Sequence, residues 1–98
     1  GNIKLGPINN YHKFAEISYL IGDINFQNRG IATEAIKQIL ILAKKKHKLI
    51  KIVATLYSNN HASRKVLEKN KFKLEGIIKK KFFFNKKRLD QLVFGRLI

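Results

Sequence analysis

The stretch that decides the fold joins a loop to the start of a helix, and residues 27–35 read Gln27-Asn28-Arg29-Gly30-Ile31-Ala32-Thr33-Glu34-Ala35. From Ile31 onward, apolar residues recur at three- and four-residue spacing through Ile36 and Leu40, which is the period of an amphipathic helix. Glycine and alanine at a helix start let the backbone come close to a ligand, and the free N–H groups there attract phosphate. Taken alone, such a stretch is more often ordinary helix capping than a turn that cradles phosphate, and the rest of the sequence has to decide between the two.

The segments before this loop predict a hairpin. Residues 2–8 alternate apolar and polar positions and then meet the turn residues Asn9 and Asn10. Ala15–Asp23 follows as a second strand that closes at Gly22. Two short alternating runs separated by turn residues are typical of antiparallel strands.

The segments after the loop predict a mixed sheet. Ile50–Tyr57 is apolar on both faces apart from Lys51 and Thr55, so we expect a central strand covered on both sides. The other expected elements are a helix at about Ala62–Lys69, a strand at Phe72–Phe84 with Gly76 as a bulge, a turn at Asn85–Arg88 and a strand at Leu89–Leu97. The order β-β-α-β-α-β-β indicates an α/β (α+β) fold.

Length and composition restrict the class of protein. The chain has 98 residues without an internal repeat, so we expect one domain over residues 1–98. No apolar run reaches the ~18 residues that a transmembrane helix needs, and we expect no membrane partner. The sequence has no cysteine, which excludes a disulfide scaffold, a cysteine-ligated zinc site and a thiol nucleophile. We expect no metal site and a cytoplasmic location.

The charge is strongly positive. Lys and Arg total 21 against 6 acidic residues, a net charge of +15. Such a balance favours polyanionic partners such as nucleic acid or phosphorylated small molecules. Lys, Ile and Asn share AT-rich codons, so the excess also fits a biased genome. The two interpretations are compatible, because a positive surface attracts phosphate whatever its origin.

A combined signature carries a family resemblance. The loop is preceded by Tyr19-Leu20-Ile21-Gly22, and residues 60–76 read Asn60-His61-Ala62-Ser63-Arg64-Lys65-Val66-Leu67-Glu68-Lys69-Asn70-Lys71-Phe72-Lys73-Leu74-Glu75-Gly76. This set resembles the GNAT superfamily of acetyl-CoA-dependent N-acetyltransferases, and in particular its RimJ/RimL-like branch. The branch carries Gln/Arg-x-x-Gly-x-Gly/Ala in the acyl-CoA loop, then Asn-x-x-Ser and Glu-Lys-x-Gly-Phe-x-x-Glu-Gly. The match covers nearly the whole chain and implies a mixed, mostly antiparallel sheet.

The resemblance implies a site for acetyl-CoA (coenzyme A) as co-substrate. The strand around Tyr19–Ile21 would splay from Ile50–Tyr57 and receive the pantetheine arm, while the loop N–H groups would hold the pyrophosphate. The implied cofactor-binding residues are Tyr19, Leu20, Ile21, Gln27, Asn28, Arg29, Gly30, Ile31, Ala32, Thr33, Asn60 and Ser63. Arg64 or Lys65 would reach the phosphates. The alternative is that Asn60 only caps the second helix and that Arg64 and Lys65 are solvated.

The chemistry requires a base. A neutral amine attacks the acetyl thioester, an oxyanion forms, and the thiolate leaves. Glu16 lies four residues before Leu20 on the same strand face, and it is the predicted catalytic base. Asp90 and His61 are weaker alternatives. The backbone N–H near Leu20 is the expected polariser of the carbonyl.

An acid is needed for the leaving thiolate. Many family members use a tyrosine seven residues after the asparagine, and here that position is Leu67. Ser63 matches the serine of the RimJ/RimL-like pattern and is the second predicted catalytic residue. Tyr57, at the end of the central strand, is a further candidate.

The sequence also departs from the family pattern. Lys71 replaces the glycine of Lys-x-Gly-Phe, which puts a tight turn in doubt. Family members carry a strand, two helices and another strand before the position that corresponds to Gly1, so we expect an N-terminally truncated, partial GNAT domain. Loss of a covering layer would expose apolar surface, and a homo-oligomer is expected for that reason.

These features predict an N-acetyltransferase that moves acetyl from acetyl-CoA to a primary amine on a small molecule or peptide. The acceptor is a protein N-terminus, a polyamine or an amino-sugar, and the positive charge favours an anionic one. A non-catalytic acyl-CoA-binding remnant is the alternative. A basic nucleic-acid-binding module is a third hypothesis, for which Lys79–Phe84 is the segment that interleaves basic and aromatic residues.

Overall fold

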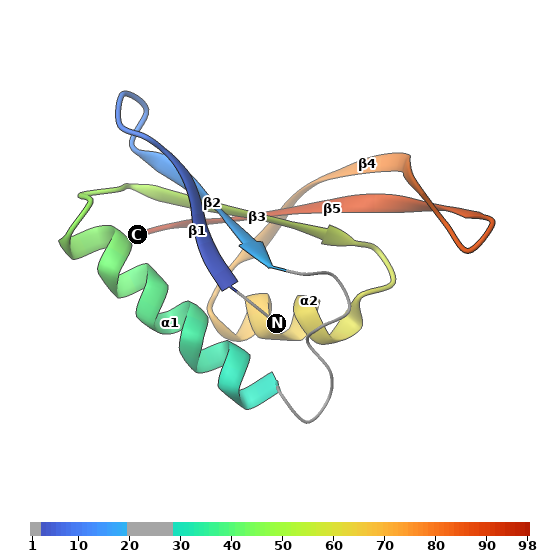
Figure 1. Ribbon diagram of the computed structural model, residues 1–98, viewed down its shortest axis with the longest axis horizontal. Helices are drawn as coiled ribbons and strands as arrows, with labels where there is room; N and C mark the ends of the chain where they lie inside the picture. The colour runs from blue at the N-terminus through green and yellow to red at the C-terminus, as the bar shows by residue number, and fades with distance from the viewer. Residues whose placement is uncertain (1–2, 20–28) are drawn as a thin grey trace.

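The fold follows the predicted order of elements. The computed structural model describes residues 3–19 and 29–98, and it confirms the order β-β-α-β-α-β-β (Figure 1). The elements are β1 (Ile3–Asn9), β2 (Phe14–Tyr19), α1 (Arg29–Lys45), β3 (Lys51–Tyr57), α2 (His61–Lys69), β4 (Lys73–Phe84) and β5 (Lys87–Leu97). Of the second predicted strand, the part after Tyr19 lies outside the described residues, as do the loop residues up to Asn28.

The sheet has five strands in the order β1-β2-β3-β5-β4. β1 and β2 form the predicted antiparallel hairpin, and β3 lies in the middle of the sheet. β2 pairs with β3 in parallel through the α1 crossover, while β5 pairs with β3 and with β4 in antiparallel fashion. The sheet is therefore mixed and mostly antiparallel, as predicted.

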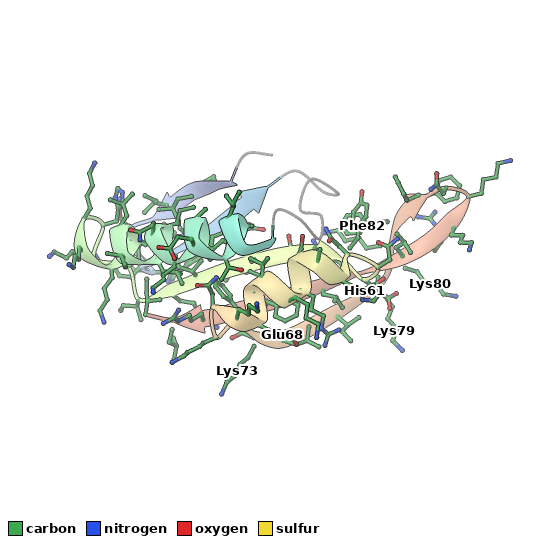
Figure 2. All side chains as sticks on the ribbon, turned by 90° about the horizontal axis from the view of Figure 1, so that it is seen from below. His61, Glu68, Lys73, Lys79, Lys80 and Phe82 are labelled. Carbon is green, nitrogen blue, oxygen red and sulfur yellow. The ribbon has the colours of Figure 1, made fainter. Side chains whose placement is uncertain are left out.

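Both helices cover one face of the sheet (Figures 1 and 2). In β3, burial alternates because successive side chains point to opposite faces, and Ile52, Ala54 and Leu56 point toward the helices. Ile36 of α1 and Phe94 of β5 join them in the core. Full burial of a side chain of this size contributes about 1.5–3 kcal/mol, so this layer supplies most of the cohesion. In the described ranges, no helix is long and apolar enough to cross a membrane.

The opposite face of the sheet differs from the prediction. A central strand covered on both sides was expected, but no described helix or strand covers this face. Val53 and Thr55 of β3 are only half-buried there. Lys51 and Glu75 form an ion pair on this face, with 2.7 Å between Nζ and Oε2. The Glu75 carboxylate lies against Gly95, where a Cβ atom would overlap it.

The β4–β5 hairpin is irregular at two places. The first bulge leaves Glu75 unpaired between Leu74 and Gly76, next to the predicted position. The second lies between Ile78 and Phe82, where Lys80 has a positive φ of 54° and donates its backbone N–H to Asp90 Oδ1 at 2.8 Å. Figure 2 shows Lys79 and Lys80 near this second bulge.

The hairpin tip is tighter than predicted. Instead of a four-residue turn, Asn85 and Lys86 alone make the turn, with φ of 50° and 61°. Positive φ at both central residues is typical of a two-residue type I′ turn, and Asn adopts it with little strain. β5 consequently begins at Lys87, two residues before the predicted Leu89.

The turn after α2 forms although glycine is absent. Lys71 adopts a left-handed φ of 65°, its N–H donates to Glu68 O at 2.9 Å, and Phe72 N–H donates to Leu67 O at 3.0 Å. These bonds satisfy the last carbonyl groups of the helix. Phe72 thereby reaches the core, where it is 3% exposed. The doubt that Lys71 raised about a tight turn is resolved in favour of the turn.

Candidate active site

The two parallel strands separate near their carboxyl ends. Pairing between β2 and β3 runs from Phe14–Lys51 to Ile17–Ala54 and then stops, although β2 continues to Tyr19 and β3 to Tyr57. The arrowheads of β2 and β3 point apart in Figure 1. We call this divergence the fork. Backbone N–H and C=O groups along a fork are available to an extended ligand, since they are not used for strand pairing.

The start of α1 presents an open, positively polarised end. The first four N–H groups of a helix have no acceptor within the helix, and the macrodipole adds about half a positive charge. No acidic side chain lies in the first turn. Ile31 is 74% exposed, and among the described residues outside its own helix a Cβ atom at Gly30 would meet no atom within 4 Å. Of the predicted cofactor residues from Gly30 to Thr33, Ala32 is the buried one and belongs to the core.

Asn60 and Ser63 lie just beyond the carboxyl end of β3. Asn60 is the N-cap of α2, and its Oδ1 accepts the Ser63 N–H at 3.2 Å. Asn60 Nδ2 and Ser63 Oγ are both buried, and neither has a hydrogen-bond partner within the described part of the chain. A buried donor without a partner costs about 1–3 kcal/mol. Polar atoms left in this state, next to a fork, indicate a place where a ligand supplies the missing partner.

Glu16 lies on the other side of the sheet. Its neighbours Ala15 and Ile17 point toward the helices, so Glu16 points to the uncovered face, where it is exposed. Its Oε1 accepts the Thr55 hydroxyl at 3.4 Å, a long contact. Glu16 and the fully buried Ser63 therefore stand on opposite faces of the sheet, with the end of the strand pairing between them.

The other candidate bases and acids have different surroundings. Asp90 accepts the backbone N–H of Lys80 at the second bulge of β4, and His61 is exposed at the start of α2. The Tyr57 ring packs on the Phe82 ring, with 4.4 Å between centroids. These contacts give Asp90 and Tyr57 structural roles.

The side chains of α2 also separate into two groups. Arg64 pairs with Glu68 at 3.5 Å and lies 5.8 Å from the centre of the Phe94 ring, whereas Lys65 is exposed. Leu67, at the position of the family tyrosine, is fully buried in the core. The structure thus keeps Lys65 available to a phosphate and gives Leu67 a packing role.

Two residues near the candidate site, Thr55 and Asn70, were not predicted from the sequence. Thr55 contacts Glu16 only because the parallel register places their strands side by side. Asn70 is 6% exposed, and its Nδ2 donates to Thr33 O at 3.1 Å, which joins the end of α2 to the start of α1. The alternation of β3 was a usable signal for Thr55, whereas Asn70 had none beyond its position after a helix.

Comparison with known proteins settles the family. The model of the acetyltransferase (GNAT) domain family matches residues 1–73. The uncharacterized N-acetyltransferase YnaD of Bacillus subtilis (strain 168) is 38% identical over 79 residues, which make up 78% of this chain and 46% of that protein. The chain belongs to the GNAT acetyltransferase family.

Solved GNAT structures share the fold. The spermidine/spermine N-acetyltransferase SpeG from Vibrio cholerae superimposes with a TM-score of 0.82 at 26% identity, over 97% of this chain and 57% of that one. RimL, a ribosomal alpha-N-protein acetyltransferase solved in complex with coenzyme A, gives a TM-score of 0.81 at 26% identity, over 96% and 52%. The chain thus spans about half the length of these relatives.

The residues present fit coenzyme A. A pantetheine arm needs backbone partners, which the fork leaves open, and a pyrophosphate needs N–H groups with space above them, which the start of α1 offers at Gly30. Asn60 Nδ2, buried without a partner in the described part of the chain, is a donor left open near the fork. Leu20, Ile21, Gln27 and Asn28 lie outside the described residues, and their roles stay predictions.

Proposed function

We propose that this chain supplies the acetyl-CoA-binding part of an N-acetyltransferase, which moves acetyl from acetyl-CoA to a primary amine. The observation that carries the proposal is the fork between β2 and β3, which opens beside the buried, unpartnered Asn60 Nδ2. Acetyl-CoA supplies an activated thioester. We also place the chain in the RimJ/RimL-like branch, on the strength of its loop and its Asn-x-x-Ser segment.

The residues hold the co-substrate by three kinds of contact. The free backbone edge at Tyr19 and the predicted Leu20 and Ile21 bind the pantetheine amides. The N–H groups from Arg29 to Ala32 bind the pyrophosphate. Asn60 Nδ2 donates a hydrogen bond that the protein itself leaves unmade, so the ligand relieves a cost present in the free protein.

The positions of Glu16 and Ser63 suit a reaction that takes place in the fork. Glu16 lies on the uncovered face, from which an amine can approach, and it takes the ammonium proton directly or through water. Ser63 lies on the helix face, and its hydroxyl relays a proton from water to the leaving thiolate, giving up one proton as it takes up another. Because the two groups are on opposite sides, the entering amine and the leaving sulfur do not compete for space.

The net positive charge of the chain favours some classes of acceptor amine over others. The net charge of +15 repels a polyamine and attracts an amine carried on an anionic body. We therefore favour an amino-sugar linked to phosphate, or a protein N-terminus within a nucleic-acid assembly, over the polyamine acceptor of SpeG. Turnover against a panel of amines identifies the class. No turnover with any amine, together with tight acetyl-CoA binding, favours the alternative of a non-catalytic acyl-CoA-binding protein.

The uncovered sheet face also supports self-association. Apolar side chains such as Leu97, which is 71% exposed, border this face. A spermidine N-acetyltransferase from Vibrio cholerae has been solved as a dodecamer. We propose that the chain forms homo-oligomers, and a single monomer-sized species in light scattering would contradict this.

The deciding experiment is calorimetric titration with acetyl-CoA at physiological salt, with ATP and heparin as polyanion controls. Preferential binding of acetyl-CoA supports the site. Equal binding of all three attributes the affinity to the general positive charge.

A variant pair makes the test specific. Gly30→Leu places a side chain in the open space above the helix start, and it should abolish acetyl-CoA binding without disturbing the fold. Lys45→Leu adds the same side chain at the exposed far end of α1 and should leave binding intact. Unchanged affinity in Gly30→Leu would refute the pyrophosphate assignment.

A further inference from the structure

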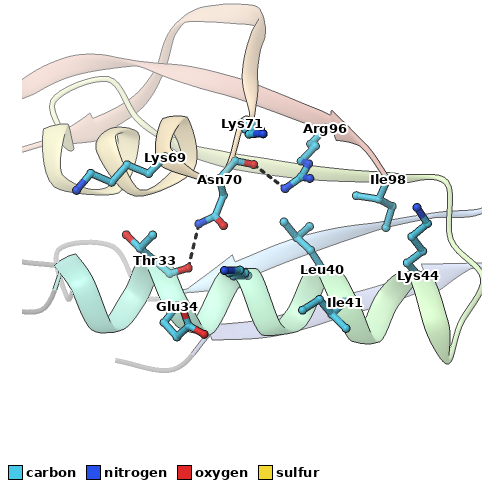
Figure 3. A pocket seen from close by; sticks show the side chains of 11 residues that line it. Thr33, Glu34, Leu40, Ile41, Lys44, Lys69, Asn70, Lys71, Arg96 and Ile98 are labelled. Carbon is cyan, nitrogen blue, oxygen red and sulfur yellow. Dashed lines mark hydrogen bonds between the residues drawn. The ribbon is translucent and has the colours of Figure 1, made fainter.

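A cationic groove opens on the helix side of the molecule. It encloses about 550 Å³ between α1, the end of α2 and the last residues of β5 (Figure 3). Small-molecule sites commonly measure ~300–1,000 Å³. Arg96 of its wall pairs with Ile52 near the start of β3, whereas the fork opens toward the end of β3. Arg96 therefore lies toward the end of β3 away from the fork, whereas Thr33 brings the groove to the first turns of α1.

The groove concentrates charge of one sign. Its cationic side chains are Lys37, Lys44, Lys69, Lys71 and Arg96. Glu34 is the one acidic side chain among the residues that line it, and its Oε1 accepts a hydrogen bond from Gln38 Nε2 at 2.9 Å. Among residues 3–19 and 29–98, no ion pair joins any of the five cations to a carboxylate. The positive charge is therefore free to bind an anion.

Arg96 is the fixed member of this set. It stands on the helix-facing side of β5, two residues after the buried Phe94, and it is half-buried. One guanidinium nitrogen donates to Asn70 O at 2.8 Å, as Figure 3 shows. Asn70 is itself held by its bonds to Thr33 O and Val66 O. A guanidinium has five N–H donors, so most of them remain for a bidentate partner.

We propose that this groove binds a phosphate monoester attached to an apolar or aromatic body. Arg96 pairs with two phosphate oxygens, and the lysines around it neutralise the second charge of the dianion. Leu40, Ile41 and Ile98 form an apolar floor on which a base or similar ring packs. Free nucleotides and the 3′-phosphorylated nucleotide end of coenzyme A both have this chemistry.

The first test is calorimetric titration with AMP, with adenosine as the uncharged control. Arg96→Gln should weaken AMP binding at least about tenfold and leave adenosine unchanged, because a charge-assisted hydrogen bond is lost. Lys37→Gln/Lys44→Gln should weaken it severalfold without touching the half-buried arginine. The matched control Lys45→Gln/Lys46→Gln removes the same charge from two exposed positions outside the groove, at the last residue of α1 and the turn residue after it. Thermal unfolding shows that each variant is folded.

The lysine control distinguishes a specific binding site from general electrostatic attraction by the positive surface. If Lys45→Gln/Lys46→Gln weakens AMP binding as much as Lys37→Gln/Lys44→Gln, or if Arg96→Gln binds AMP like the unaltered protein, the proposal is overturned. AMP binding requires no acetyl transfer. A chain that binds AMP through Arg96 but does not bind acetyl-CoA would therefore refute the proposed function and uphold the groove.

A second titration assigns the source of the phosphate. Coenzyme A and dephospho-coenzyme A differ only in the 3′-phosphate. If the cofactor supplies the phosphate, the unaltered protein prefers coenzyme A and Arg96→Gln loses that preference. If a free nucleotide supplies it, Arg96→Gln loses AMP binding while its relative affinity for the two coenzymes stays unchanged.

Discussion

Asn60 allows helix stability and cofactor binding to be separated by two substitutions. Its Oδ1 caps α2 by accepting the Ser63 N–H at 3.2 Å, whereas its Nδ2 is buried without a partner within the described residues. Asn60→Ser keeps a capping oxygen and removes the amide donor. Asn60→Ala removes both. The two variants therefore differ only in the cap, and both differ from the native chain in the donor.

The magnitudes follow from these contacts. Loss of an N-cap oxygen costs about 1 kcal/mol, which lowers the melting temperature of a domain of this size by ~4–8 °C. We expect Asn60→Ala to melt that far below Asn60→Ser. Asn60→Ser should melt at or above the native temperature, because it deletes an unsatisfied buried donor. Both variants should bind acetyl-CoA about three- to tenfold more weakly, the value of one neutral hydrogen bond.

Thermal unfolding followed by circular dichroism measures the first effect, and calorimetric titration measures the second. Asn59→Ala, at the exposed neighbouring position, is the control and should change neither. Native affinity for acetyl-CoA in Asn60→Ser would refute the role of Nδ2. Equal melting temperatures for the serine and alanine variants would refute the role of the cap.

The remaining predictions concern one residue each. Lys71→Gly should raise the free energy of unfolding by about 0.5–1 kcal/mol in urea titrations, since glycine adopts the left-handed conformation without strain; a loss of stability would contradict this. Leu67→Ala should lower it by about 2–5 kcal/mol, because the residue is fully buried, and a change under 1 kcal/mol would argue against the described core. Asp90→Ala should cost about 1 kcal/mol through the lost Lys80 bond, whereas Asp90→Asn, which keeps an acceptor oxygen, should recover most of it. Glu16→Gln should lower turnover about 100-fold or more at unchanged acetyl-CoA affinity, and native turnover would exclude Glu16 as the base.

The order of helices and strands could be predicted because apolar residues recur along the chain with the spacing of a helix or of a strand. The apolar spacing through Ile36 and Leu40 predicted α1, and the structure extends it by two residues to Arg29. The alternating runs predicted the hairpin and the central strand. Element ends were less certain, as the early start of β5 at Lys87 shows, because turn conformation depends on single residues such as Asn85.

The roles of the loop residues stay predictions, and the three-dimensional relation of the candidate residues could not be read from the sequence. The family pattern identified Gly30 and Asn60, and their surroundings suit the proposed contacts. That Glu16 and Ser63 lie on opposite faces depends on strand register and helix packing, which no local pattern encodes. Arg96 was not predictable for the same reason, because a tertiary hydrogen bond to Asn70 holds its side chain in place.

The bulge at Lys80 has a consequence for behaviour in concentrated solution. β4 is one of the two edge strands of the described sheet, and long edge strands with exposed apolar residues add strands from other molecules. Ile77, Ile78, Phe83 and Phe84 are all 47–66% exposed on this strand. The left-handed kink at Lys80 divides the edge into two short ladders, and the flanking lysines place charge at the break. We therefore expect the three consecutive lysines, Lys79–Lys81, to oppose edge-to-edge pairing of molecules, and we expect a variant with a straight edge to aggregate while retaining its native core.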